Sequence, residues 1–139
     1  MVVITFVDTP GAATRLLRAD TTLNGMFGGA VFCDEVPDGY DGPFVLVRGS
    51  AVQPTAPGVL GWDDWELLVD VVSLPLDAAT ARAGAGRVRE VLTGARGSVA
   101  AGVVLQDVDV TGMVYIDDPT FSPSRPRWVL TVNATVRAS

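Results

Sequence analysis

The sequence of 139 residues contains no histidine and no lysine, and Cys33 is its one cysteine. Without histidine, a Ser–His–Asp triad and a Cys/His zinc site are excluded within one chain. Without lysine, Schiff-base catalysis and a phosphate-binding loop of the Walker type are excluded as well. A lone cysteine cannot form an intrachain disulfide, and Cys33 lies in an apolar run that predicts a small buried side chain.

Long hydrophobic runs are also missing. Residues 1–7 carry no basic residue and are followed at once by Asp8 and Pro10, which is unlike a secretion signal. The apolar run 99–105 has seven residues, whereas a membrane-spanning helix needs about 20. Acidic residues outnumber basic ones 16 to 10, opposite to the balance of a surface that binds phosphate backbones. We therefore expect a soluble cytoplasmic protein without a membrane partner.

Three helices are predicted, each after an aspartate that can cap it. The first follows Asp8 or Thr9, and the second follows Asp20 and stops at the glycine pair 28–29. The main helix covers about 78–94 after Asp77. Its apolar residues recur at helical spacing: Ala81, Ala85, Val88, Leu92 and Ala95. Gly84 and Gly86 each weaken it by roughly 1 kcal/mol relative to alanine, so this helix must depend on packing.

Alternating or continuous apolar runs predict the strands. They cover 30–36, 44–47, 65–74, 99–110 with an extension over 113–116, and 127–137. Strand 65–74 is apolar on one face and half apolar on the other, which places it centrally in its sheet. Segments 53–61 and 117–126 are rich in proline and predict loops. We expect a single α+β domain over 1–139, with a mainly antiparallel or mixed sheet packed by two or three helices.

Two acidic motifs invite a metal hypothesis. The segment 34–39 begins like a calcium loop, but Val36 and Val45 occupy ligand positions, which favours a solvated turn. Asp107 and Asp109 would lie on one face of a strand, about 6.5–7 Å apart. Such a pair can hold a hard cation, although the solvent face of an edge strand is the commoner meaning. No G-x-S-x-G motif occurs, and we expect no catalytic residue, metal or cofactor.

The order of segments carries a family resemblance. The helical opening over 16–20 and 23–27 leads through 30–32 into the Pro/Asp/Gly segment 34–43 and the strand 44–47. The long strand 65–73 then runs into the helix that contains Val88 and Leu92, and two strands close the chain. In this order the chain resembles the tail terminator proteins of long-tailed, non-contractile bacteriophages.

The resemblance implies a structural virion protein and not an enzyme. Such proteins form a six-fold ring at the head–tail neck, which binds the last ring of the tail tube, stops tube growth and joins the filled head. The implied partners are further copies of the chain, the tail tube protein and the head–tail connector, while DNA passes through the lumen without specific binding. Candidate subunit or tube contacts are Trp62, Phe121, Arg125, Arg127, Asp107 and Asp109.

Two alternatives remain open from the sequence. The chain could be another neck protein, a head–tail connector or head-closure subunit, since these are also small, acidic and ring-forming. From a different class, it could be a small ligand-binding domain that uses carboxylates and a metal, with Asp107 and Asp109 as ligands.

Overall fold

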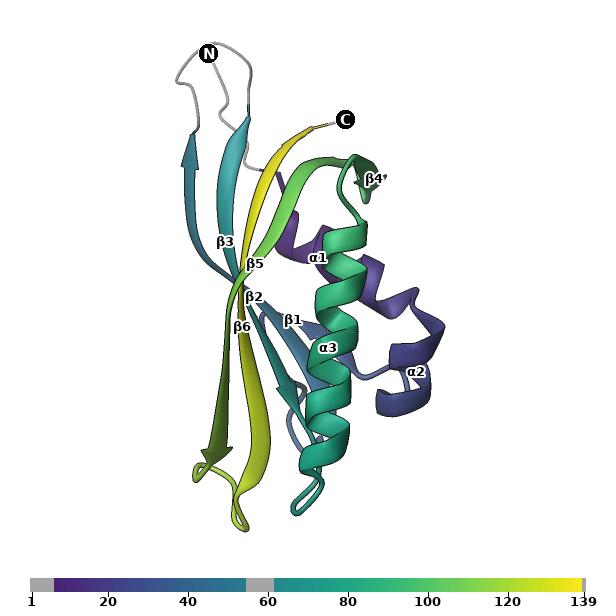
Figure 1. Cartoon of the computed structure of the whole chain (residues 1–139), viewed down its shortest axis with the longest axis vertical. Coiled ribbons are helices and arrows are strands. Elements are labelled where there is room, and N and C mark those ends of the chain that lie inside the picture. The colour runs from purple at the N-terminus through teal and green to yellow at the C-terminus, as the bar shows by residue number, and fades with distance from the viewer. Residues whose placement is uncertain (1–6, 55–61, 139) are drawn as a thin grey trace.

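The computed structural model describes residues 7–54 and 62–138, which form one six-stranded sheet with three helices on one face (Figure 1). In chain order the elements are α1 (Thr9–Arg18), α2 (Thr21–Phe27), β1 (Val31–Cys33), β2 (Phe44–Pro54), β3 (Asp63–Val72), α3 (Ala78–Gly94), β4 (Ser98–Ala100), β5 (Val103–Asp118) and β6 (Arg125–Ala138). The predicted α+β class is confirmed. None of the helices in these residues is long and apolar enough to cross a membrane.

The strands are ordered β1-β2-β3-β6-β5-β4 across the sheet. Strand β1 runs parallel to β2, and the other neighbours are antiparallel, so the sheet is mixed. Strand β3 has a neighbour on each side along its whole length, which confirms its predicted central place. Strand β4 pairs only with residues 103–105 of β5, so the rest of β5 is an outer edge.

The predicted capping aspartates begin all three helices. The side chain of Asp8 accepts from the amide of Gly11, Asp20 from Leu23 and Asp77 from Thr80, at 3.0–3.2 Å. Each cap satisfies an amide that has no acceptor within the first turn. Helix α2 ends at Gly28, whose left-handed backbone (φ 61°) suits glycine.

The main core lies between the sheet and the helices. All five residues of the predicted stripe are buried, four on α3 and Ala95 directly after it, and α3 packs against β3, β5 and β6. Gly84 is buried as well, because a Cβ there would lie 2.6 Å from Cζ of Phe27 and 3.0 Å from Cγ1 of Val71. The missing side chain thus lets α3 approach α2 and β3 closely. Cys33, in contrast, is half-buried and not enclosed as expected.

Several predicted strand boundaries were wrong for identifiable reasons. The predicted strand 99–110 is broken by a tight turn at Ala101 and Gly102, both at positive φ, which separates β4 from β5. Strand β1 ends early because Asp34 adopts a φ of 67°. Strand β2 continues to Pro54, into the predicted loop, since its pairing with β3 extends that far. Residues 55–61 of that predicted loop lie outside the described residues.

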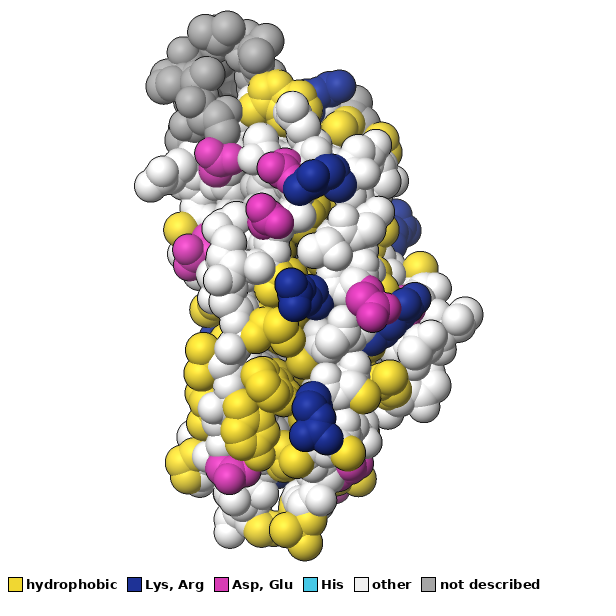
Figure 2. Space-filling model, in the orientation of Figure 1, with side chains coloured by type: hydrophobic (Ala, Val, Ile, Leu, Met, Phe, Trp, Pro, Cys, Tyr) yellow, Lys and Arg dark blue, Asp and Glu magenta, His cyan; other side chains and the backbone are white. Residues whose placement is uncertain are grey.

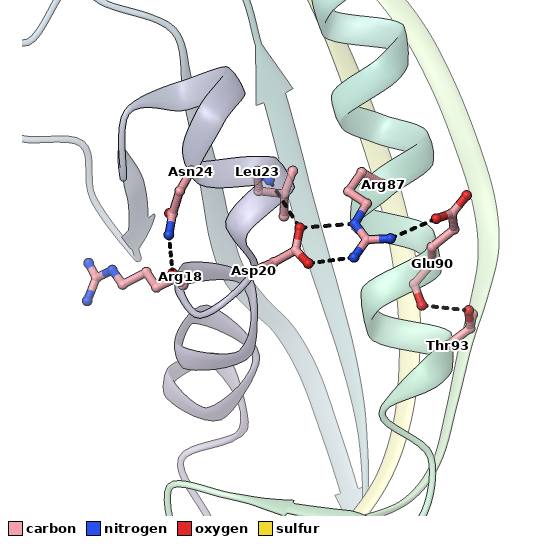
Figure 3. Close-up of polar contacts among 7 residues, drawn as sticks. All are labelled: Arg18, Asp20, Leu23, Asn24, Arg87, Glu90 and Thr93. Carbon is pink, nitrogen blue, oxygen red and sulfur yellow. Dashed lines mark hydrogen bonds and ion pairs between the residues drawn. The ribbon is translucent and has the colours of Figure 1, made fainter.

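One ion pair joins α2 to α3 (Figure 3). Two guanidinium nitrogens of Arg87 donate to the two carboxylate oxygens of Asp20, at 2.6 and 3.0 Å, and a third reaches Glu90 at 3.0 Å. Asp20 also caps α2, so one carboxylate links the start of α2 to α3. The bond from Arg87 is the largest cause that places the pKa of Asp20 below its ordinary value, against the opposing effect of burial.

We predict opposite effects for two alanine substitutions on α3. Gly84→Ala should lower the free energy of unfolding by about 1–2 kcal/mol, because its methyl group overpacks Phe27 and Val71. Gly86→Ala should raise it by about 0.5–1 kcal/mol, because no atom lies within 4 Å of the added Cβ. Urea denaturation of both variants measures the difference, and equal stabilisation by both would contradict the close approach at Gly84.

The Asp20–Arg87 pair predicts a pH dependence. The lowered pKa of Asp20 means that the carboxylate stabilises the fold above its unfolded-state pKa of about 3.9 and loses this effect as the pH falls further. Asp20→Asn keeps a capping side chain but loses the charge. Its Tm should therefore lie below that of the wild type at pH 7 and converge with it below about pH 4. The matched control Asp109→Asn, at an exposed site without a described ion pair, should show no such convergence.

Candidate assembly surfaces

The helix-free face of the sheet carries a chain of charges around a buried carboxylate, and the two arginines in this chain are partly exposed. Asp70 on β3 is fully buried, and its two carboxylate oxygens lie 2.7 Å from Arg48 on β2 and 3.0 Å from Arg127 on β6. Arg127 also reaches Asp118, the last residue of β5, at 2.7 Å. A buried carboxylate is costly unless it is paired, so these four strands are held in one arrangement.

At Asp118, burial and hydrogen bonding have opposite effects on the pKa. Its burial opposes ionisation, but hydrogen bonds from Thr120 and Arg127 outweigh that effect and keep the pKa of Asp118 below its ordinary value. The carboxylate accepts from both the amide and the hydroxyl of Thr120, at 3.0 and 2.6 Å. Asp118 therefore fixes the start of the β5–β6 loop.

Arg125 connects three segments at the end of the sheet where β5 ends and β6 begins, which is called the lower end because it lies at the bottom of Figure 1. Its guanidinium donates to the carbonyl of Ser73 at 2.7 Å and to that of Gly42 at 2.8 Å. It also lies over the rings of Phe121 (4.8 Å) and Phe44 (5.9 Å). Only 5% of Arg125 is exposed, and burial lowers its pKa. A small second core around Phe44 thus covers part of the helix-free face.

The six predicted contact residues fall into two groups. Phe121, Arg125 and Arg127 lie together at the lower end, where the last two are bonded within the chain. Asp107 and Asp109 lie on β5 opposite Thr135 and Asn133, toward the other end, and Trp62 precedes β3 beside the Arg137 guanidinium at 5.1 Å. Their roles in assembly stay predictions.

The acidic motifs prove to be surface features. Asp107 pairs with Arg96 at 2.7 Å, and both side chains are more than half exposed. Within residues 7–54 and 62–138, no three His, Cys, Asp or Glu side chains are grouped to hold a metal ion. The acidic segment 34–41 is a turn between β1 and β2 whose carboxylates are exposed, as predicted.

An exposed apolar surface at the lower end escaped the sequence-based prediction. Among the described residues, six large hydrophobic side chains are exposed, and five of them belong to the β3–α3 loop and the end of β5: Leu74, Leu76, Val114, Tyr115 and Ile116. Leu76 is entirely exposed and adopts a φ of 66°, a conformation that is unfavourable for leucine. Tyr115 points to the opposite face of the sheet from Val114 and Ile116, because side chains alternate along a strand. Exposed apolar side chains gathered at one end of a protein are typical of a contact with another protein. In the sequence, the consecutive apolar residues 114–116 could have indicated these exposed side chains.

The matching family model is tail completion protein gp17, and it covers residues 11–137. Among solved structures, a chain of the virion of a native gene transfer agent particle is similar, with 25% identity and a TM-score of 0.78. That match covers 92% of this chain and 93% of the other. None of the curated proteins matches the chain.

Arg125 offers a test of what the predicted contact residues do. Arg125→Ala should lower the free energy of unfolding by about 2–4 kcal/mol, because the buried carbonyl of Ser73 and the partly buried carbonyl of Gly42 lose a charged donor. Arg137→Ala, at an exposed site on the same strand, should change it by less than about 0.5 kcal/mol. If chemical denaturation shows Arg125→Ala to be as stable as the wild type, its bonds within the chain are not structural.

These observations establish the family and confirm the resemblance to tail terminators that the order of segments predicted. The fold agrees over almost the entire length with a subunit of an assembled particle, and the family model covers nearly the whole chain. The chain belongs to the tail completion protein gp17 family and is a structural protein of phage-type tails.

Proposed function

We propose that this chain forms a homohexameric ring that caps the tail tube, stops its growth and provides the surface that joins tail to head. The observation that carries the proposal is the end-to-end match to a virion chain, together with the family model over 11–137. In this proposal the whole chain, 1–139, acts as one tail-terminator domain at the neck of the virion, assembled in the host cytoplasm.

The distribution of surface features supports a ring. A closed ring of identical subunits uses two different patches on each subunit, one of which meets the other on its neighbour. The sheet offers different surfaces at its two edges, since β1 bounds one edge and most of β5 bounds the other. The apolar lower end and the charged upper end can then contact different proteins above and below the ring, the tube protein and the connector.

The predicted contact residues suit those two ends. Phe121 belongs to the β5–β6 loop, which Arg125, Arg127 and Asp118 hold in place. A loop that is already ordered loses little entropy when it docks. Trp62, Asp107 and Asp109 lie toward the opposite end and would contact the other neighbour in the particle.

The charge of the chain supports passage of DNA through the ring. With a net charge of −6, the ring carries an excess of negative charge, and phosphate backbones are not retained by such a surface. DNA would pass through the lumen without specific binding.

The test is the length distribution of tails in particles assembled without this protein, measured by negative-stain electron microscopy. We expect overlong tubes of variable length without heads, because nothing stops the addition of tube rings. Complementation with the wild-type chain should restore a single length. Tails of normal length that fail to join filled heads would instead assign the chain to the connector side of the neck, and unaltered infectious particles would overturn both roles.

A further inference from the structure

Two surfaces at the lower end of the sheet differ in charge, the groove beside Arg82 of α3 and the acidic segment 34–41. There β5 is the outermost strand on one side, because β4 covers only residues 103–105. Strand β1 bounds the other side, and the acidic segment 34–41 that follows it packs through Val36 and Tyr40 on the small core of the helix-free face. The two surfaces therefore lie on opposite sides of one subunit, which is the arrangement that head-to-tail contacts need.

The β5 side has a groove next to a free cation. The groove, of about 390 Å³, is lined by Ala78 and Arg82 of α3, Tyr115 of β5 and Trp128 of β6. The rings of Tyr115 and Trp128 lie 5.4 Å apart, and Tyr115 remains 41% exposed. Arg82 is exposed and forms no ion pair within the described part of the chain. Figure 2 shows hydrophobic side chains gathered over this lower part of the molecule, beside basic ones.

The β1 side has the opposite charge. Four exposed carboxylates occupy eight residues, and none forms an ion pair with a described residue: Asp34, Glu35, Asp38 and Asp41. The segment is nevertheless held in place. The Tyr40 hydroxyl donates to the carbonyl of Pro43 at 2.7 Å, and its ring packs edge-on against Phe32 at 5.2 Å. The carboxylates are thus presented on an anchored turn and are not part of a free tail.

We propose that the groove around Arg82 receives the acidic segment 34–41 of a second copy of this chain, which forms the lateral contact of the ring. The inference rests on the proposed function and specifies its subunit interface. Charge complementarity supports this occupant, since Arg82 is exposed without an ion pair and segment 34–41 presents four exposed carboxylates that also form none within the described residues. The apolar walls of the groove would exclude water from the contact and strengthen the ion pair.

Several other charged groups near the edges already form ion pairs within the chain. Arg96 and Asp107 already pair with each other, and Arg48, Arg127 and Asp118 belong to the chain of charges around Asp70. A neighbouring subunit could use these groups only by breaking bonds within the chain. Arg82 and the carboxylates of 34–41 need no such exchange.

A charge-swap experiment on the full chain tests the contact. Arg82→Glu and Asp38→Arg should each weaken ring formation at least about tenfold, since each places like charges together. The double variant should return to within about threefold of the wild type, because the pair is restored with reversed signs. Arg15→Glu is the matched control, an equal charge change on the exposed face of α1. Native mass spectrometry and pelleting with purified tail tubes measure rings in solution and on the tube, and circular dichroism confirms folding.

The outcomes separate this inference from the proposed function. If the wild type forms rings and Arg82→Glu forms them equally well, the ring stands but the proposed interface is wrong. If the single variants form normal rings that no longer bind tubes, the groove binds the tube protein and the inference is also overturned. If the wild type forms no ring, either in solution or on tubes, both proposals fail.

Discussion

The burial of β3 on both faces is the constraint on which the rest of the structure depends. Toward the helices, Leu67, Val69 and Val71 are enclosed in the main core. Away from the helices, the carboxylate of Asp70 is enclosed as well, and a buried carboxylate is stable only when its charge is matched. The arginines of β2 and β6 supply that match. Through Arg127 the same interaction reaches the end of β5, so the packing of one strand sets the geometry of four.

This internal packing leaves the exposed apolar residues and the exposed charges at the edges and ends of the sheet. The helices cover one face, and the second small core covers part of the other. The exposed apolar residues therefore concentrate where β5 and the β3–α3 loop extend past the helices. A subunit of an assembly needs such a division, because its contacts must be exposed in the free chain without weakening the fold.

The likeness to a virion chain extends over more than 90% of both chains, although only a quarter of the residues are identical. What the two chains share is the order and packing of elements, which apolar patterns specify and which tolerates substitution at most surface positions. This is why the family could be identified from the order of segments although no short motif marks it. The residues proposed for the subunit contact, such as Arg82, are not marked by such a pattern of apolar positions.

The sequence by itself determined the local structure: capping aspartates placed three helices, the stripe on α3 faced the core as its spacing predicted, and strand 65–74 was recognised as central. These features depend on neighbours in the chain and on periodicity, which can be read directly. Only the tertiary structure decided the extension of β2, the pairing of Asp70 with two arginines and the groove between α3 and the last two strands. Each of these depends on segments that are distant in the sequence. The sequence around a charged residue looks the same whether its side chain is paired in the interior or exposed at an edge.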